Sequence, residues 1–299
     1  MISIIICSVN SNMLKEVAEN VKDTIGILHE IIAIDNRNGK YGICEAYNIG
    51  ASKSKYDVLC FMHEDLIFHT IDWGRRVVEH LNDTTIGLIG VAGGTYKSKS
   101  LDAWGIDPIE FARMNVLQDY KSGRPQDHLY SNPFNEFVAD VASVDGLWFC
   151  TRKEVWQNNK FDETTLKEFH FYDIDFSLQV LQSYRVCVVY DILLQHISEG
   201  SINRSWLENA VLFHNKWKQT LPYSVDGLYD EKKKAIEIRR AKNILQLLKK
   251  YRFSQLIYLQ HYFRYVILYI SSEQFIIDKN ICKNNIRYRL TAAYKRLIR

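Results

Sequence analysis

The 299-residue sequence predicts an α/β protein with a doubly wound mixed sheet, followed by a helical and basic C-terminal extension. Short apolar runs alternate with helical periods early in the chain, and polar residues directly follow several of these runs. The charge also changes along the sequence. Residues 231–299 hold 17 Lys and Arg against 4 Asp and Glu, a net charge of +13, so the total of +3 leaves −10 for residues 1–230. We therefore expect a boundary near residues 229–231.

The first part of the chain predicts a β-α-β-α-β arrangement with right-handed crossovers. Its apolar runs have no helical period and are typical of strands buried on both faces. The polar turn Ser8–Asn12 could cap the first helix. The expected elements are strand 2–7, helix 13–24, strand 30–34, helix 42–54 and strand 56–62.

The middle of the chain continues this sheet. Residues 95–135 mix Gly, Pro, Asp and Lys without a sustained period, which indicates a long loop region that could cover a substrate cleft. Residues 193–196 are expected to close the sheet, and residues 205–219 to form a helix that packs on it. The other expected elements are helix 72–81, strand 86–94, strand 142–150, a helix from residue 152 and strand 185–190.

Glu64 and Asp65 follow the central strand at its carboxyl end, where open α/β sheets bind their ligands. Their carboxylates are hard oxygen ligands that suit Mg²⁺ or Mn²⁺, and such an ion can neutralise a diphosphate. An acidic pair after a strand is also common as a helix N-cap or a solvated turn. The two residues alone leave both interpretations open.

The composition excludes several classes of protein. Six cysteines lie far apart without a CxxC pair, which predicts a reducing cytoplasm and neither a disulfide framework nor a zinc site. The N-terminus begins with a strand rather than a signal peptide. The apolar stretches near the C-terminus are interrupted by Arg264 and Glu273 before they reach the length of a membrane span. We therefore expect a cytoplasmic protein.

Four motifs lie in a recognisable order. Asp35 follows the second strand, Asn48-Ile49-Gly50 precedes the central strand, His63-Glu64-Asp65 ends it, and residues 171–178 read FYDIDFSL. In this order they resemble the family 2 glycosyltransferases, inverting enzymes of the GT-A fold, and in particular the bacterial polysaccharide-type members. The third motif resembles the DxD of that family, and the fourth its ED-x-D-L-x-x-R segment. The resemblance covers residues 2–205.

The resemblance implies roles for individual residues. Asp173 would be the catalytic base, and Asp65 and His196 would bind a divalent metal ion, Mn²⁺ or Mg²⁺. The residues implied to bind the nucleotide sugar are Ser8, Asn10, Asp35, Asn48, His63, Glu64, Asp145 and Gly146. Apolar neighbours surround Asp173 in the sequence, so burial should raise its pKa and favour a role as base. Asp173 and Asp175 could also cap or salt-bridge a helix that begins there.

Three positions depart from the family pattern. His63 stands in place of the first aspartate of the DxD, and Tyr172 stands where a glutamate usually precedes the base. Gln179 replaces the arginine that ends the fourth motif. These departures concern metal coordination and the position of the acceptor, and they leave Asp65 and Asp173 in place.

The expected function is inverting transfer of a sugar from a nucleotide-diphosphate sugar to a glycan or lipid-linked acceptor, in surface polysaccharide or glycan synthesis. Residues 1–205 would be the GT-A catalytic domain and residues 206–299 a helical, basic region. A nucleotidyltransferase would need a Gly-rich phosphate loop near the first strand, and Ser8–Asn12 contains no glycine. A catalytically silent nucleotide-binding scaffold that acts through its basic arm is the other alternative.

The C-terminal region becomes basic and helical beyond Asp226, with an apolar stretch from Phe253 to Ile270 and a basic tail that ends at Arg299. A basic amphipathic helix suits an anionic membrane surface, which would place the protein at the inner face of the membrane. Homodimerisation through these helices is the other interpretation. Nucleic-acid binding is disfavoured because the sequence contains no known reader motif.

Overall fold

The computed structural model describes residues 1–104, 109–120, 122–197, 200, 202–225, 231–272 and 279. The chain forms two compact units, Met1–Leu228 and Tyr229–Arg299. The division lies where the charge of the sequence changes sign. A functional boundary at residue 205 stays a prediction.

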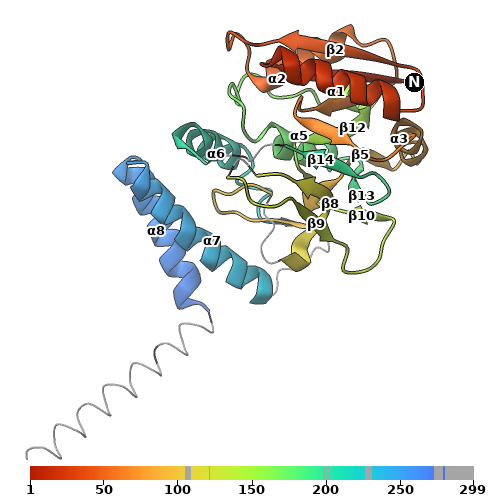
Figure 1. The fold of residues 1–299 in the computed structure, drawn as a ribbon. Coiled ribbons are helices and arrows are strands. Elements are labelled where there is room, and N and C mark those ends of the chain that lie inside the picture. The colour runs from red at the N-terminus through yellow and green to blue at the C-terminus, as the bar shows by residue number, and fades with distance from the viewer. Residues whose placement is uncertain are drawn as a thin grey trace, which may run out of the picture. The chain divides into compact units, whose positions relative to one another are not determined.

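A seven-stranded mixed sheet forms the centre of the first unit (Figure 1). Its strands in spatial order are β10 (Val138–Asp140), β13 (Arg185–Val189), β5 (Ile86–Gly90), β12 (Trp148–Arg152), β3 (Val58–Met62), β1 (Ile2–Ser8) and β2 (His29–Asp35). β1 pairs in parallel with β2 and β3, whereas β12 runs antiparallel between β3 and β5. The predicted α/β fold with a mixed sheet is confirmed.

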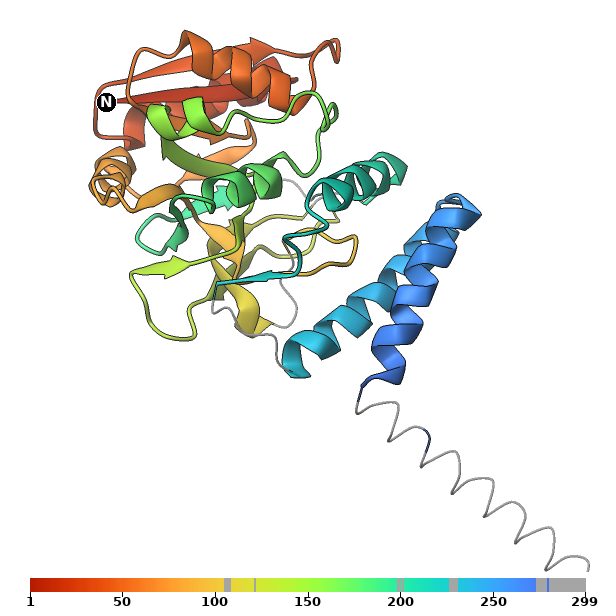
Figure 2. The ribbon, with the colours of Figure 1, turned by 180° about the vertical axis from the view of Figure 1, so that it is seen from behind.

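Helices cover both faces of this sheet. They are α1 (Ser11–Thr24), α2 (Ile43–Lys53), α3 (Trp73–Leu81), α4 (Lys153–Asn158), α5 (Tyr172–Val180) and α6 (Arg204–Lys216), with a short 3-10 helix η1 (Ile109–Phe111). Ile4 and Ile6 of β1 share a core with α1 and α3. Ile5 points to α2, where Gly50 leaves room, because a Cβ there would lie 2.3 Å from its Cγ2. Figure 1 shows α1 in front of the sheet, and Figure 2 shows α2 on the opposite side.

A second, six-stranded sheet lies against the carboxyl ends of the central strands. Its strands are β11 (Ser143–Val144), β6 (Ala92–Gly94), β8 (Ala112–Gln118), β14 (Leu194–His196) and β4 (Leu66–Phe68) in order, with β9 (Asp127–Ser131) paired to β8. β7 (Tyr96–Lys97) pairs with β15 (Tyr223–Ser224). The expectation that residues 193–196 close the first sheet is therefore wrong, since β14 belongs to the second.

Two predicted single strands are each divided in the structure. The run 86–94 bends at Val91 into β5 and β6, and the run 142–150 separates at Asp145 and Gly146 into β11 and β12. The members of each pair belong to different sheets. An apolar run does not reveal such a bend, because strands of both sheets are buried. Gly93 allows β6 and β11 to approach each other closely, since a Cβ at this position would lie 2.4 Å from a backbone oxygen of the neighbouring strand.

The prediction of a long loop over residues 95–135 is wrong for β8 and β9, which form an antiparallel hairpin. In β8 the side chains of Ala112, Met114 and Val116 belong to the hydrophobic core. Arg113 and Asn115 alternate with them and are also buried. The period of a strand is therefore present, but two buried polar residues conceal it in the sequence.

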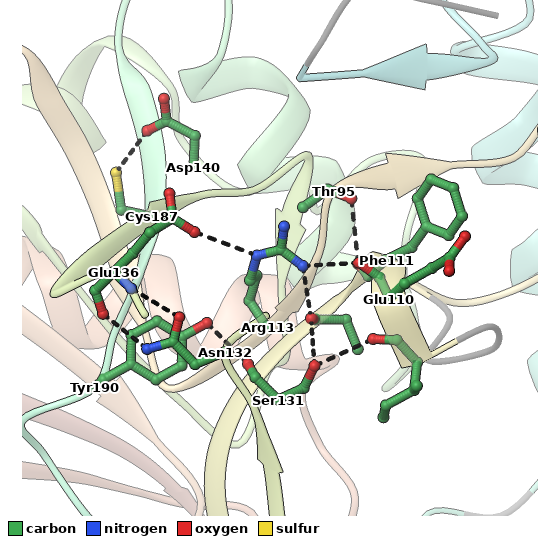
Figure 3. A network of polar contacts seen from close by, with 12 residues as sticks. Thr95, Glu110, Phe111, Arg113, Ser131, Asn132, Glu136, Asp140, Cys187 and Tyr190 are labelled. Carbon is green, nitrogen blue, oxygen red and sulfur yellow. Dashed lines mark hydrogen bonds and ion pairs between the residues drawn. The ribbon is translucent and has the colours of Figure 1, made fainter. Parts of the chain in front are cut away.

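Arg113 connects β8 to the loop that follows β9 (Figure 3). Its guanidinium donates to the carbonyl oxygens of Glu110 and Ala112, each at 2.9 Å, and lies 3.6 Å from the carboxylate of Glu136. The hydroxyl of Tyr190 donates to the carbonyl oxygen of Ser131 at 2.9 Å. This network holds the base of the β8–β9 hairpin.

The second unit contains a helical hairpin of α7 (Glu231–Lys250) and α8 (Gln255–Ile270). The two helices run antiparallel side by side in both views (Figures 1 and 2). The predicted C-terminal helices are confirmed, and most of the predicted basic tail lies outside the described residues. Within the described part of the chain, no helix combines the length and the apolar character that crossing a membrane requires.

Candidate active site

Three possible metal ligands meet at the carboxyl end of β3. His63 and Asp65 follow this strand, and His196 ends β14. Nδ1 of His63 lies 3.8 Å from Oδ1 of Asp65, and Nε2 of His196 lies 3.6 Å from Oδ2 of Asp65. One ligand atom of each residue lies within 4.8 Å of the others. These separations are too long for hydrogen bonds and leave room for an ion among the three side chains.

Tyr172 determines which nitrogen of His63 carries the proton. The hydroxyl of Tyr172 donates to the carbonyl oxygen of Gly146 at 3.0 Å, so it has to accept in its 2.9 Å contact with Nε2 of His63. Neutral His63 is therefore protonated on Nε2, and its Nδ1 lone pair faces Asp65. Desolvation also lowers the pKa of His63, which favours the neutral ring. Two of the departures from the family pattern, His63 and Tyr172, are thus joined by one hydrogen bond.

Gln118 determines which nitrogen of His196 carries the proton. Its amide nitrogen donates to the carbonyl oxygens of Asp119 at 2.7 Å and of His196 at 3.4 Å, so its Oε1 accepts from Nδ1 of His196 at 3.1 Å. Nε2 then holds a lone pair, and it is buried without a hydrogen-bond partner. Two imidazole lone pairs and one carboxylate that face one another are a donor set that fits a divalent cation such as Mn²⁺.

Asp173 lies in the first turn of α5, in a cleft beside this cluster. Desolvation raises its pKa to about 7, and the negative charge of Asp145 adds to the rise. The rise that the apolar neighbours of Asp173 predicted is confirmed. Near neutral pH such a carboxylate can accept a proton from a hydroxyl group, which is the property that a general base needs.

The helix α6 holds the beginning of α5. Phe171 precedes α5 with a left-handed φ of 68°, and its ring lies 5.0 Å from that of Trp206 and 5.3 Å from that of Phe213. Asp175 is buried and accepts from the ammonium group of Lys216 and, at 2.7 Å, from the indole of Trp217. Asp175 therefore has the structural role that the sequence allowed for it, and the base candidate stands on an anchored helix.

The turn between β11 and β12 brings Asp145 and Gly146 to the same cleft. A Cβ on Gly146 would lie 2.2 Å from the hydroxyl oxygen of Tyr172 and 3.2 Å from Oδ2 of Asp173, so only glycine fits without displacing them. Asp145 accepts from the indole of Trp104 at 2.7 Å. The close approach of this turn thus positions the groups around Asp173.

Two clefts share side chains of this site. The first, of about 650 Å³, contains Asp65 and is bordered by the turn after β1 and by the outer end of the β8–β9 hairpin. The second, of about 460 Å³, contains Asp173 and an aromatic wall that includes Trp206. His63 and Phe169 line both clefts. A molecule that extended from one cleft into the other would pass beside the candidate metal ligands.

Glu64 shapes the first cleft and is turned away from the metal ligands. Its carboxylate accepts from the hydroxyl of Ser8 at 2.6 Å and from the backbone N–H groups of Val9 and Asn10 at 3.0 and 2.9 Å. Asn10 in turn caps α1 with its side chain. Both oxygens of Glu64 are thus engaged at the turn after β1.

Three residues that the sequence predicted for nucleotide binding, Ser8, Asp35 and Asn48, line neither cleft. Asp35 is exposed at the end of β2, where hydrogen bonds from the Arg37 guanidinium at 2.6 and 2.9 Å lower its pKa to about 2. Asn48 donates to the carbonyl oxygen of Phe161 at 2.9 Å and to the carboxylate of Glu163 at 2.8 Å. Asn48 thus holds the segment after α4, and the nucleotide contacts of all three residues stay predictions.

The structure adds residues that the sequence did not single out. Asp119, Tyr120 and Arg124 reach the first cleft from the outer end of the hairpin. The guanidinium of Arg124 lies 3.6 Å from the centre of the Tyr120 ring. Gln118, which orients His196, lies beside them. All four fall in the region that we expected to cover the cleft, but the pairing of β8 with β14 that brings them there leaves no signal in the sequence.

The fold and this site define the class of protein. A mixed α/β sheet with possible cation ligands after its central strand is the nucleotide-sugar transferase fold of the GT-A type. Residues 3–218 match the profile described as "Glycosyltransferase like family", so the chain belongs to this family. The resemblance to glycosyltransferases is thereby confirmed. None of the curated proteins matches the chain.

Solved structures share this fold at low sequence identity. The structure of GalNAc-T7 with UDP, GalNAc and Mn²⁺ has a TM-score of 0.52 and 13% identity, over 89% of this chain and 57% of that one. The mannosyltransferase PcManGT from Pyrobaculum calidifontis, in complex with GDP-Man and Mn²⁺, has a TM-score of 0.44 and 12% identity, over 83% and 63%. A197 from STIV has a TM-score of 0.38 and 13% identity, over 68% and 96%. The chain thus spans less than two thirds of the first two proteins.

Proposed function

We propose that this glycosyltransferase-family protein transfers a sugar from a nucleotide-diphosphate sugar to an acceptor hydroxyl with inversion at the anomeric carbon. The observation that carries the proposal is the position of Asp173. The pKa of this carboxyl group is raised to about 7, and the group lines the second cleft. Its neighbour Tyr172 forms a hydrogen bond with His63, and His63 lines both clefts. A base for the acceptor and a site for the diphosphate are therefore adjacent.

The nucleotide and diphosphate would bind in the first cleft. Asp65, His196 and His63 would hold Mn²⁺ or Mg²⁺, which neutralises the charge of the departing diphosphate. The guanidinium of Arg124, which also lines this cleft and pairs with Asp127 at 3.1 Å, would be the cationic side chain available to an anionic ligand there. The similar fold of a structure that contains UDP and Mn²⁺ supports this assignment.

The acceptor would bind in the second cleft. Its hydroxyl oxygen forms the bond to the anomeric carbon while the bond from that carbon to the diphosphate oxygen breaks, and the hydroxyl proton passes to Asp173. Attack from the face opposite the leaving group inverts the configuration. Trp104, Phe169 and Trp206 offer aromatic surface of the kind on which the apolar faces of a sugar ring pack.

We further propose that the acceptor is a glycan or a lipid-linked glycan used in surface polysaccharide or glycan synthesis. A lipid-linked acceptor would require the protein to work at a membrane surface, peripherally and from the cytoplasmic side. The excess of Lys and Arg over Asp and Glu in residues 231–299 supports this location. Homodimerisation through the C-terminal helices is the competing use of that region.

Calorimetric titration tests the donor site. The purified chain is titrated with UDP, GDP, dTDP and CDP, each with and without Mn²⁺, and the series is repeated with Asp65→Ala. Asp23→Ala is the matched control, since Asp23 is an exposed aspartate on α1 outside both clefts. We expect metal-dependent binding of one nucleotide that Asp65→Ala abolishes and Asp23→Ala retains. Absence of binding for every nucleotide would refute the donor site and favour a scaffold.

A further inference from the structure

α8 exposes large apolar side chains along its whole length. Leu256, Phe263 and Ile267 are 68%, 61% and 69% exposed, values that leave most of each side chain in contact with solvent. Spacings of three and four residues place the exposed apolar side chains on one side of the helix. This apolar face consists of Leu256, Leu259, Tyr262, Phe263, Ile267 and Ile270. A continuous apolar surface of this kind marks an interaction site.

The charged group of α8 points the other way. Arg264 is the one Lys, Arg, Asp or Glu within Gln255–Ile270, and it pairs with Glu237 of α7, which is 1% exposed. The polar contact therefore lies inside the hairpin and the apolar side chains lie outside. This distribution is the reverse of the one in a helix that packs its apolar face on a protein core and presents charge to water.

Cationic side chains gather at the turn between α7 and α8. Lys249, Lys250 and Arg252 are exposed there. Lys249, Arg252, Phe253 and Leu259 help to line a hollow of about 510 Å³ in which basic and apolar groups alternate. The basic turn thus adjoins the N-terminal end of the apolar face.

Arg252 occupies a backbone conformation that favours glycine. Its φ is 52°, and the N–H of Phe253 bonds to the carbonyl oxygen of Leu248 at 2.9 Å, the pattern that ends many helices at a glycine. A side chain in this left-handed conformation carries a steric cost that glycine avoids. Replacing Arg252 by glycine therefore removes a cation without a loss of helix termination.

We propose that α8 lies in the surface of an anionic phospholipid membrane, with its apolar face among the acyl chains and Lys249 and Arg252 at the phosphate headgroups. A helix with a lipid-facing apolar side and adjoining cations has this preferred position. A second copy of the chain fits less well, because residues 231–299 carry a net charge of +13 and two such regions repel each other. This membrane contact would give a structural basis to the peripheral location in the proposed function. Only the biological purpose of the contact rests on that proposed function.

Vesicle binding tests this inference with the full chain. Sedimentation compares vesicles of phosphatidylcholine with vesicles that contain about one third phosphatidylglycerol, at about 0.1 and 0.5 M salt. Leu259→Glu introduces a charge into the apolar face, and Leu212→Glu on α6 is the matched control, since the two leucines are 47% and 44% exposed. We expect binding to the anionic vesicles that weakens with salt, falls about tenfold or more in Leu259→Glu and persists in Leu212→Glu.

Arg252→Gly supplies an independent measurement. Its thermal unfolding temperature should equal or exceed that of the wild type, whereas its vesicle affinity should fall several-fold. Equal vesicle binding by Leu259→Glu and Leu212→Glu would overturn the proposal. A wild-type dimer in light scattering that Leu259→Glu converts to a monomer, without vesicle binding by either, would assign the apolar face to a second copy. The assay contains no sugar donor, so a negative result would leave the transferase proposal intact.

Discussion

Replacing Asp173 by asparagine tests the most consequential electrostatic feature of the site. The carboxyl has a pKa of about 7 in the folded chain, against an ordinary value of 3.8. The folded state therefore holds this proton more tightly than the unfolded state does. As the pH rises from about 4 to about 7, the unfolded state loses its proton first, and the stability of the fold decreases. Above pH 7 the whole penalty is present.

The difference between these two pKa values corresponds to a penalty of at most about 4 kcal/mol. Asp173 keeps part of its surface toward the cleft, so we expect about half of this, ~2 kcal/mol. Asparagine carries no charge at any pH. Asp173→Asn should therefore match the wild type near pH 4 and unfold at a temperature higher by roughly 4 to 8 °C near pH 8.

Activity should change in the opposite direction. The wild-type rate of sugar transfer should rise with pH up to about 7 and level off above it, because only the ionised carboxylate of Asp173 accepts the proton. Asp173→Asn should lower the rate by roughly 10² to 10⁴ while nucleotide affinity stays unchanged. The measurements are thermal unfolding across the pH range and a transfer assay with the donor that calorimetry identifies.

Asp175→Asn is the control from the same helix. Asp175 is 1% exposed and its carboxylate pairs with the ammonium group of Lys216. Asp175→Asn therefore removes one of the carboxylates that pair with this partly buried cation and should destabilise the fold by about 3 kcal/mol. If Asp173→Asn and the wild type showed the same unfolding temperature at every pH, Asp173 would not be the desolvated carboxyl described here. Its assignment as base would then lose its physical support.

Three further substitutions test the contacts around the cation site and the first cleft. Tyr172→Phe removes the acceptor for Nε2–H of His63, so Mn²⁺ affinity in a titration should fall about 10 to 100-fold. An unchanged affinity would show that this hydrogen bond does not orient a metal ligand. Gly146→Ala places a Cβ 2.2 Å from the hydroxyl of Tyr172 and should lower the free energy of unfolding by about 1 to 3 kcal/mol in denaturant, whereas a neutral result would contradict this close approach. Glu64→Gln replaces charge-assisted hydrogen bonds from the Val9 and Asn10 N–H groups and the Ser8 hydroxyl by neutral ones. It should cost about 1 kcal/mol of stability and weaken metal-free nucleotide binding, whereas wild-type binding would show that the turn holding Ser8 does not contact the nucleotide.

The sequence determined the α/β class, the first strands of the sheet and the identity of several site residues. The runs at β1 and β3 predict buried strands because nearly all of their side chains are apolar. Asp65 can be found because it lies in the polar motif that follows β3. The desolvation of Asp173 was also predictable, since aromatic and aliphatic neighbours on the same helix surround it. These properties depend on residues that are adjacent in the chain.

Only the tertiary structure decided which groups would act together. The pairing of β14 with β4 and β8 brings His196 and Gln118 to Asp65. In the sequence His196 lies more than a hundred residues from Asp65, and Gln118 lies about fifty residues from it. The tautomer of His63, which follows β3, depends on Tyr172 at the start of α5. Asn48, which the sequence assigned to the nucleotide, is engaged by a loop far along the chain. Local sequence patterns report burial and period, whereas strand order and hydrogen bonding between distant segments depend on long-range packing that leaves no local pattern.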